Sequence, residues 1–215
     1  MQSAQSFGGG ISRFGHVLLP DADQQGIDIG ISLLDSMPII TCSGKRAGKI
    51  APQLTDKGYC STKKLHYYCA KLHSIAFHRP GTLPMPEFFS LTKASEHDLN
   101  AVREILPHLI NRALVGDKAY SNEELNEALQ EQAGSYIYTP VKLVKGQTQN
   151  IRQFKHAADK LFSTAVSRIR QPIESLFNWI IKKTDIQRAS KVRSRRGLIV
   201  HIFGKIAAAI SNWVF

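Results

Sequence analysis

Apolar and polar residues alternate along residues 27–33, which is the first regular pattern in the chain. A period of two predicts a strand with one buried face, and we expect this strand to end at Pro38. Asp35 stands between apolar neighbours towards the end of the strand. A carboxylate buried there without a partner costs free energy, so the pattern predicts that Asp35 faces a cation or several hydrogen-bond donors.

Two further strands are predicted to follow as a hairpin. Residues 41–63 are rich in Gly, Lys, Ser and Thr and predict a loop. Residues 65–77 alternate well enough for a strand, residues 79–82 form a turn, and residues 86–92 supply a third strand. The first three strands would therefore form an antiparallel meander.

Helices and strands alternate in the middle of the chain. Ser95 is predicted to cap an amphipathic helix, after which a short apolar run ends at Asp117 as a fourth strand. A second helix is predicted over residues 121–132, capped by one of its first two residues, and residues 135–139 form a fifth strand. An acid at the carboxyl end of a strand in an open α/β sheet lies where such folds bind ligands, so Asp117 is a candidate site residue.

The last third of the chain is predicted to be helical. Residues 152–183 show helical spacing, and Pro172 either kinks this helix or occupies the first turn of a new one. An apolar stripe follows Pro172, with Glu174 on its flank. The most apolar stretch, residues 197–215, contains His, Lys and Asn, which favours a helix packed on the core over a membrane helix.

This order of elements predicts an α/β fold with a mixed five-stranded sheet, antiparallel in its first three strands and flanked by helices. The 215 residues are 43% hydrophobic and 21% charged, which is typical of a globular protein of about one domain. Three cysteines without a Cys-x-x-Cys spacing indicate a reduced, cytoplasmic compartment, and residues 1–27 are expected to be a loose leader without a signal peptide.

The net charge of +11 is spread unevenly along the chain. Residues 1–141 contain 13 Lys and Arg against 14 Asp and Glu, whereas residues 142–215 contain 15 against 3. The excess in the last part predicts a surface that binds a polyanion, with nucleic acid favoured over a merely solvated basic face. The candidate phosphate-binding residues are Lys182, Lys183, Lys191, Arg193, Arg195 and Arg196.

Three motifs carry acids on successive predicted elements: Leu-Asp-Ser-Met-Pro at residues 34–38, Gly-Asp-Lys-Ala-Tyr at 116–120, and Arg-Gln-Pro-Ile-Glu-Ser-Leu-Phe at 170–177. The order strand-Asp35, strand-Asp117, helix-Glu174 resembles the RNase H-like DDE transposases and integrases, and is closest to bacterial insertion-sequence transposases. Residues 64–73 and 95–98 also look like that group. The resemblance extends from about residue 28 to the end of the chain.

The resemblance implies an RNase H-like fold and a transposase that cuts and joins DNA. Asp35 would bridge two Mg²⁺ or Mn²⁺ ions about 3.5–4 Å apart, with Asp117 and Glu174 each completing the coordination of one ion. Water would first free a 3′-OH at the end of the element, and this 3′-OH would then attack target DNA. The expected partners are DNA, as transposon ends and target, and a second copy of the chain in a homodimer, with neither a membrane nor a small-molecule cofactor. The protein would associate with the bacterial nucleoid.

The motif around the glutamate departs from the pattern of many relatives, which is Tyr-x-x-Arg-x-x-x-Glu followed by Lys seven residues later. The arginine is present as Arg170, which could orient the Glu174 carboxylate or contact a DNA phosphate. The tyrosine position holds Ser167, and the lysine position holds Ile181 with Lys182 one residue later. The roles of the tyrosine and the lysine are therefore not transferred to this chain.

Relatives of this kind usually carry a helical DNA-binding region before the first catalytic strand. Residues 1–27 are too short and too rich in glycine for a helix-turn-helix. The sequence therefore predicts a DDE catalytic domain over residues 28–215, with a basic helical part at 142–215, that lacks an N-terminal end-recognition domain.

Each acid also has a structural alternative. Asp35 could cap a bend before Pro38, Asp117 could be an ordinary turn residue, and Glu174 could be a surface glutamate. The same fold could serve a nuclease without strand transfer, or an inactive DNA-binding remnant of a transposase. His66, His73 and His97 could suggest a zinc site, but ordinary strand and cap histidines are favoured because no fourth ligand has metal spacing.

Overall fold

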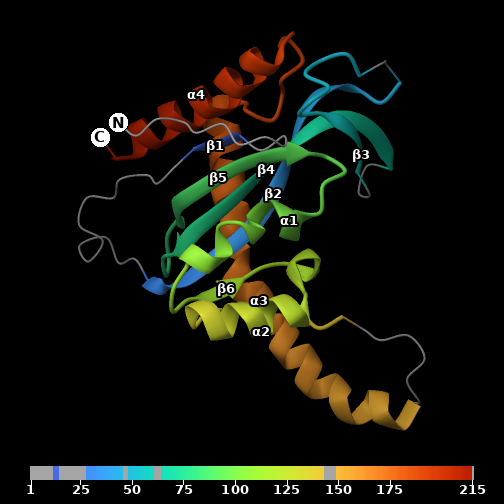
Figure 1. Ribbon diagram of the computed structural model, residues 1–215, viewed down its shortest axis with the longest axis vertical. Coiled ribbons are helices and arrows are strands. Elements are labelled where there is room, and N and C mark those ends of the chain that lie inside the picture. Colours follow the sequence, from blue (N-terminus) through green and yellow to red (C-terminus); the bar gives the residue numbers. More distant parts are fainter. Residues whose placement is uncertain (1–11, 15–27, 46–47, 61–63, 143–148, 215) are drawn as a thin grey trace.

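Two helical layers enclose a twisted sheet in the computed structural model, which describes residues 12–14, 28–45, 48–60, 64–142 and 149–214 (Figure 1). The strands are β1 (Ser12–Phe14), β2 (Asp28–Ser43), β3 (Asp56–Cys60), β4 (Leu65–His78), β5 (Met85–Lys93), β6 (Ala113–Val115) and β7 (Tyr136–Tyr138). The helices are α1 (Asp98–Arg103), α2 (Glu123–Ala133), α3 (Gln149–Thr184) and α4 (Arg195–Val214), with short 3₁₀ turns η2 (Leu106–His108) and η3 (Lys118–Tyr120).

The sheet has the order β1-β5-β4-β2-β6-β7, with β3 added beside β4. Strands β2, β4 and β5 form the predicted antiparallel meander, and β6 and β7 extend the sheet in parallel. This mixed sheet flanked by helices confirms the α/β fold class and is compatible with an RNase H-like fold. The structure adds β1 and β3 to the five predicted strands, and β3 lies inside the segment that we predicted as a loop. The rest of the predicted leader lies outside the described residues.

Strand β2 does not end at Pro38 as predicted but continues to Ser43, so Asp35 lies in its middle. The strand can continue through Pro38 because its neighbour on the side away from β4 pairs with only part of it. Strand β6 pairs only with residues 31–33 of β2, and further along this edge the described residues provide a single bridge, from Ile40 to Arg188. A proline lacks the backbone donor that a central strand needs but is tolerated along an edge.

The alternation of β2 divides the core between the two faces of the sheet. Leu33, Met37 and Ile39 point to one side, where they pack with α3 and α4. Leu34 points to the other side, where it packs with α1, η3 and α2. Asp35 follows the parity of Leu33, so its side chain faces α3.

The helix caps show one wrong prediction. His97, not Ser95, caps α1, and its Nδ1 accepts a hydrogen bond from the Leu99 N–H at 3.3 Å. Ser95 instead donates its backbone N–H and its hydroxyl to Asp56 on β3. Helix α2 is capped by Asn122, one of the two predicted caps, whose Oδ1 accepts from the Leu125 N–H at 2.8 Å.

Helix α3 is one continuous helix through Pro172, which lies inside it and not in the first turn of a new helix. The predicted stripe of Ile173, Phe177 and Ile180 is buried against the sheet, and this packing stabilises the helix despite the missing backbone donor. Helix α4 packs Leu198, Ile202 and Ile206 into the same cluster, as expected of a core-packed helix over residues 197–215. A search of the described residues finds no helix with the length and apolar character needed to span a membrane.

A buried ion pair connects two strands across the sheet. Glu87, the extra residue at an irregularity in β5, is 5% exposed, and its Oε2 lies 2.5 Å from Nη1 of Arg112, just before β6. The Arg112 guanidinium also donates to Ser32 on β2 at 3.3 Å and lies over the ring of Phe77.

We expect the Arg112→Met variant to lose about 3–5 kcal/mol in free energy of unfolding, because Glu87 would remain buried without its counter-charge. Urea denaturation measures this loss. The double variant Glu87→Leu/Arg112→Met should recover most of the stability, since it leaves no isolated charge. A single variant as stable as the wild type would contradict a structural role for the pair.

Candidate active site

Asp35 is a largely buried carboxyl at the centre of the face of β2 that meets α3. Its side chain is 16% exposed, its Oδ2 lies 2.9 Å from Nη1 of Arg170, and its Oδ1 accepts the Ser36 N–H at 2.9 Å. Burial raises the pKa of Asp35 from 3.8 to about 6. Arg170 and the Ser36 N–H oppose this shift, whereas the charges of Asp117 and Glu174 add to it. Asp35 is therefore a buried acid that lies within electrostatic reach of the other two predicted acids.

The parallel pairing of β2 and β6 explains how Asp117 comes close to Asp35. Leu33 is in register with Val115, and each acid lies two residues beyond its partner in that pair. The Asp117 Oδ1 also accepts the Ala119 N–H at 2.8 Å and so caps η3. Asp117 is thus the turn residue of the structural alternative as well as a neighbour of Asp35.

Gly116 and Tyr120 shape the turn that carries Asp117. Tyr120 is 1% exposed beneath the turn, and a Cβ at Gly116 would lie 2.7 Å from the Tyr120 ring. The Gly116 N–H donates to the Tyr138 carbonyl at 3.0 Å, which ties the turn to β7. Burial raises the pKa of the Tyr120 hydroxyl, with smaller contributions from Asp98, Asp35 and Asp117. No role was predicted for Tyr120 from the sequence, although its position four residues after Gly116 was a usable signal.

Glu174 lies on α3 one turn beyond Arg170, and its side chain is 51% exposed. Nη2 of Arg170 donates to Oε1 of Glu174, while Nη1 of the same guanidinium binds Asp35. Arg170 therefore joins a strand acid to a helix acid 139 positions further along the chain. Of the two roles considered for Arg170, the structure shows the contact with Glu174 and adds the contact with Asp35.

The guanidinium of Arg170 thus binds two carboxylates, from β2 and α3, and the third, on the β6–η3 turn, acts electrostatically on Asp35. All three offer hard oxygen donors, which is the chemistry that Mg²⁺ and Mn²⁺ require. The described side chains contain no ready-made group of three acids, histidines or cysteines spaced to share a metal ion. The donor types and the electrostatic coupling fit a divalent metal, and Arg170 supplies the positive charge that Asp35 and Glu174 share in this structure.

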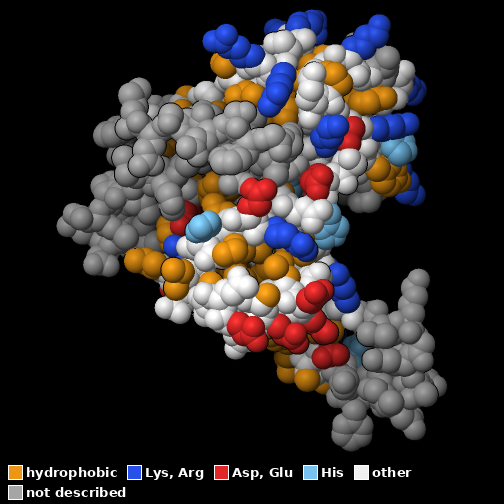
Figure 2. Space-filling model, in the orientation of Figure 1, with side chains coloured by type: hydrophobic (Ala, Val, Ile, Leu, Met, Phe, Trp, Pro, Cys, Tyr) orange, Lys and Arg blue, Asp and Glu red, His pale blue; other side chains and the backbone are white. Residues whose placement is uncertain are grey.

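The six predicted phosphate-binding residues are all exposed on one part of the surface. Lys182 and Lys183 lie in the last turn of α3, Lys191 and Arg193 in the following loop, and Arg195 and Arg196 in the first turn of α4. Two backbone hydrogen bonds of 2.8 Å attach the loop to Ile40 of β2. Figure 2 shows Lys and Arg side chains gathered at the end of the molecule where α4 lies, and Asp and Glu side chains gathered over α2.

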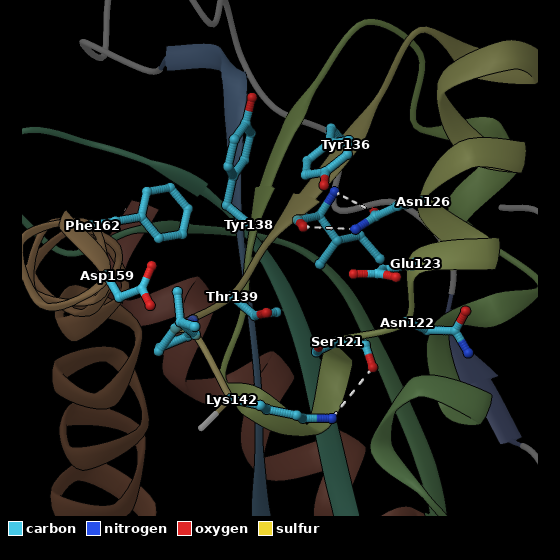
Figure 3. Close-up of a pocket in the computed structure, with 13 residues that line it drawn as sticks. Ser121, Asn122, Glu123, Asn126, Tyr136, Tyr138, Thr139, Lys142, Asp159 and Phe162 are labelled. Carbon is cyan, nitrogen blue, oxygen red and sulfur yellow. Dashed lines mark hydrogen bonds between the residues drawn. The ribbon is translucent and has the colours of Figure 1, made fainter. Parts of the chain in front are cut away.

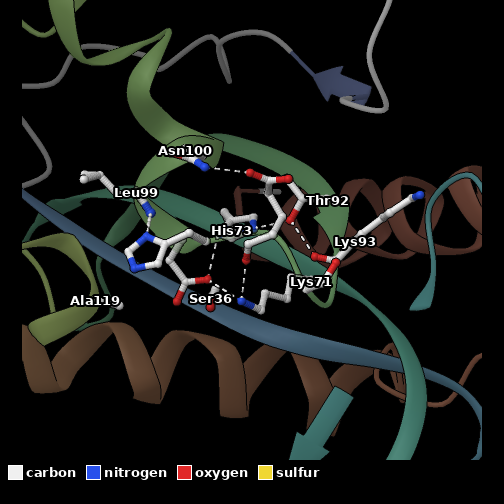
Figure 4. A network of polar contacts seen from close by, with 12 residues as sticks. Ser36, Lys71, His73, Thr92, Lys93, Leu99, Asn100 and Ala119 are labelled. Atoms are coloured by element: carbon white, nitrogen blue, oxygen red, sulfur yellow. Dashed lines mark hydrogen bonds and ion pairs between the residues drawn. The ribbon is translucent and has the colours of Figure 1, made fainter. Parts of the chain in front are cut away.

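A polar network lies on the opposite face of β4 from Asp35 (Figure 4). Lys71 Nζ lies 2.8 Å from Oδ1 of Asp98 and donates to the Glu96 carbonyl, and His73 Nε2 lies 2.8 Å from the Thr92 hydroxyl. Burial lowers the pKa of His73 to about 4, so this histidine is neutral at pH 7. The network attaches residues 95–98 to the sheet.

The three histidines of the zinc alternative lie in separate settings. His73 belongs to this network, His97 caps α1, and the exposed His66 packs its ring against Tyr59. The structure therefore does not bring them together as ligands of one ion.

A pocket of about 710 Å³ lies beyond Asp117 on the outer edge of β7 (Figure 3). Tyr136, Tyr138 and Phe162 line it, and the Asn126 side chain beside them bonds both backbone groups of Ile137. Lys142 donates to the Ser121 carbonyl at 3.4 Å. Asp35, Asp117 and Glu174 do not line this pocket.

Comparisons with known proteins support the same assignment as the site. No curated protein and no solved structure matches the chain. The family model described as transposase DDE domain matches residues 26–211, which include all three acids. The protein therefore belongs to the DDE transposase family.

Proposed function

We propose that the chain catalyses DNA transposition of an insertion sequence, by metal-dependent phosphodiester hydrolysis followed by strand transfer. Its family consists of transposases, which act on DNA and generally use divalent metals. The single observation that carries the proposal is the convergence of Asp35, Asp117 and Glu174 from three separate elements, in which the charges of Asp117 and Glu174 both raise the pKa of Asp35.

In this proposal Asp35, Asp117 and Glu174 would hold the divalent metal through their carboxylate oxygens. The metal would activate the attacking oxygen and stabilise the charge on the phosphate and on the leaving oxygen. The chain's own contribution would be to hold Asp35 in a largely buried position, to present Asp117 on a turn fixed by Gly116 and Tyr120, and to orient Glu174 through Arg170. The basic surface near α4 would bind the phosphates that flank the reacting one.

The experiment that tests the proposal is nicking of supercoiled plasmid by the purified protein with Mg²⁺ or Mn²⁺, compared with EDTA. We expect nicked circles only with the metal, and joined products when DNA with a free 3′-OH is supplied. Nicking without joined products would favour a nuclease of the same fold. A folded protein that binds DNA but never nicks it would favour an inactive remnant. The replacement of the Tyr and Lys of the glutamate motif by Ser167 and Ile181 also fits that alternative.

The triple variant Arg193→Gln/Arg195→Gln/Arg196→Gln is expected to weaken DNA binding and to flatten its salt dependence. Each phosphate contact that is lost should lower the slope of log affinity against log salt concentration by about 1. Fluorescence anisotropy with a labelled duplex at several salt concentrations measures this slope. An unchanged slope would remove these three residues from the DNA interface.

A further inference from the structure

Residues 1–141 are close to neutral in total, but they contain one strongly basic segment. Residues 44–66 contain six Lys and Arg but a single acid, Asp56. The residues of this segment that the structure describes lie in the connection that follows β2, in β3 and at the start of β4. We call the described part of this segment, residues 44–45, 48–60 and 64–66, the β3 arm.

The side chains of the β3 arm present positive charge and one aromatic ring to solvent. Lys45, Lys49, Lys57 and Lys64 are all exposed. Tyr59, which is 56% exposed, packs its ring against His66. Both carboxylate oxygens of Asp56 accept hydrogen bonds from the backbone and the hydroxyl of Ser95. The four exposed lysines outnumber this single acid of the segment, and such an excess of positive charge fits a polyanion.

The β3 arm continues the basic surface of the C-terminal part in one direction from the acids. Ile40, to which the 187–189 segment is hydrogen-bonded, lies five residues beyond Asp35 on β2, and Ser43 lies eight residues beyond it. At about 3.3 Å per residue, the arm begins roughly 26 Å from Asp35 along the strand.

Helix α2, which lies away from the β3 arm in Figure 1, would repel a polyanion. Helix α2 exposes Glu123, Glu124, Glu127 and Glu131 and has no Lys or Arg between Glu123 and Ala133. Figure 2 shows this separation, with acidic side chains over α2 and basic ones towards α4 and β3. This separation of charge favours a path for bound DNA that runs from Asp35 towards the β3 arm and away from α2.

We propose that the β3 arm is a second DNA-binding surface, which contacts the backbone of the duplex roughly 8 base pairs from the phosphate at the acids, since one base pair spans about 3.4 Å. This inference rests on the proposed function, because it takes duplex DNA as the ligand. It adds a binding surface and a direction for the DNA that the three acids and the C-terminal basic residues do not provide.

The test compares two variants that each lose one positive charge. Lys57→Gln changes the arm, and Arg103→Gln changes an exposed residue of α1 that lies outside both the arm and the basic C-terminal part. Affinity for a labelled duplex of about 24 base pairs is measured by anisotropy, in EDTA, at several salt concentrations. We expect the arm variant to reduce the salt slope by about 1 and the control variant to leave it close to that of the wild type.

A second measurement checks the spacing. Nicks made by the wild type in an end-labelled linear duplex should be scarce within about 8 base pairs of the end that the arm must reach, and the arm variant should lose this bias. Equal salt slopes for the arm and control variants would overturn the inference, whether or not the protein nicks DNA. Failure of the wild type to bind any duplex would overturn it together with the proposed function.

Discussion

The Asp117→Asn variant is expected to fold and bind DNA like the wild type but to lose metal-dependent nicking by about 10³-fold or more. Asparagine keeps an oxygen that can accept the Ala119 N–H, so the cap of η3 survives. It lacks the negative charge that a divalent ion requires and that raises the pKa of Asp35. The substitution therefore separates the turn role of Asp117 from its role in the acid cluster.

Plasmid nicking with Mn²⁺ measures the loss, and circular dichroism and duplex binding show that the fold and the DNA surface are intact. The matched control is Glu127→Gln, which neutralises an exposed acid on α2, outside the cluster, and should nick normally. Wild-type nicking by Asp117→Asn would show that Asp117 serves only the turn. Asp35→Asn should behave as Asp117→Asn does, since Asp35 is one of the three carboxylates that would hold the metal.

Much of the fold followed from local patterns, and the exceptions have distant causes. Alternation alone placed Leu33 and Asp35 on one face of a strand, and the structure confirms the meander around them. The passage of β2 through Pro38 depends on how far β6 pairs along its edge, which the local sequence does not encode. The choice of His97 over Ser95 as a cap depends on Asp56, which lies 39 residues away from Ser95.

In the candidate site, too, local motifs could be predicted from the sequence, whereas contacts between residues far apart in the chain could not. The motifs identified the three acids, but the contact between Arg170 and Asp35 spans 135 residues and follows only from the packing of α3 on the sheet. Averaging the charge over residues 1–141 hid the β3 arm, because the acids of α2 offset its lysines in the sum. Charge is therefore better counted over segments the size of one or two elements than over large fractions of a chain.

The Arg170→Ala variant is expected to reduce nicking by about 10²-fold at pH 7 and to move the acid limb of the pH–activity profile to higher pH. Arg170 lowers the pKa of Asp35, so its removal raises that pKa further above 6 and reduces the ionised fraction at neutral pH. Removal also frees Glu174 from the one hydrogen bond that the structure shows for its carboxylate.

The control is Arg170→Lys, which keeps the positive charge but replaces a planar fork that binds two carboxylates by a single ammonium group. We expect the lysine variant to keep the wild-type pH profile and to lose rate at every pH, because charge is preserved while the position of Glu174 is not. If Arg170 contacted only a DNA phosphate, its replacement by alanine would instead weaken DNA binding to the same extent at every pH. An alanine variant with the wild-type pH profile would therefore show that Arg170 does not act through Asp35.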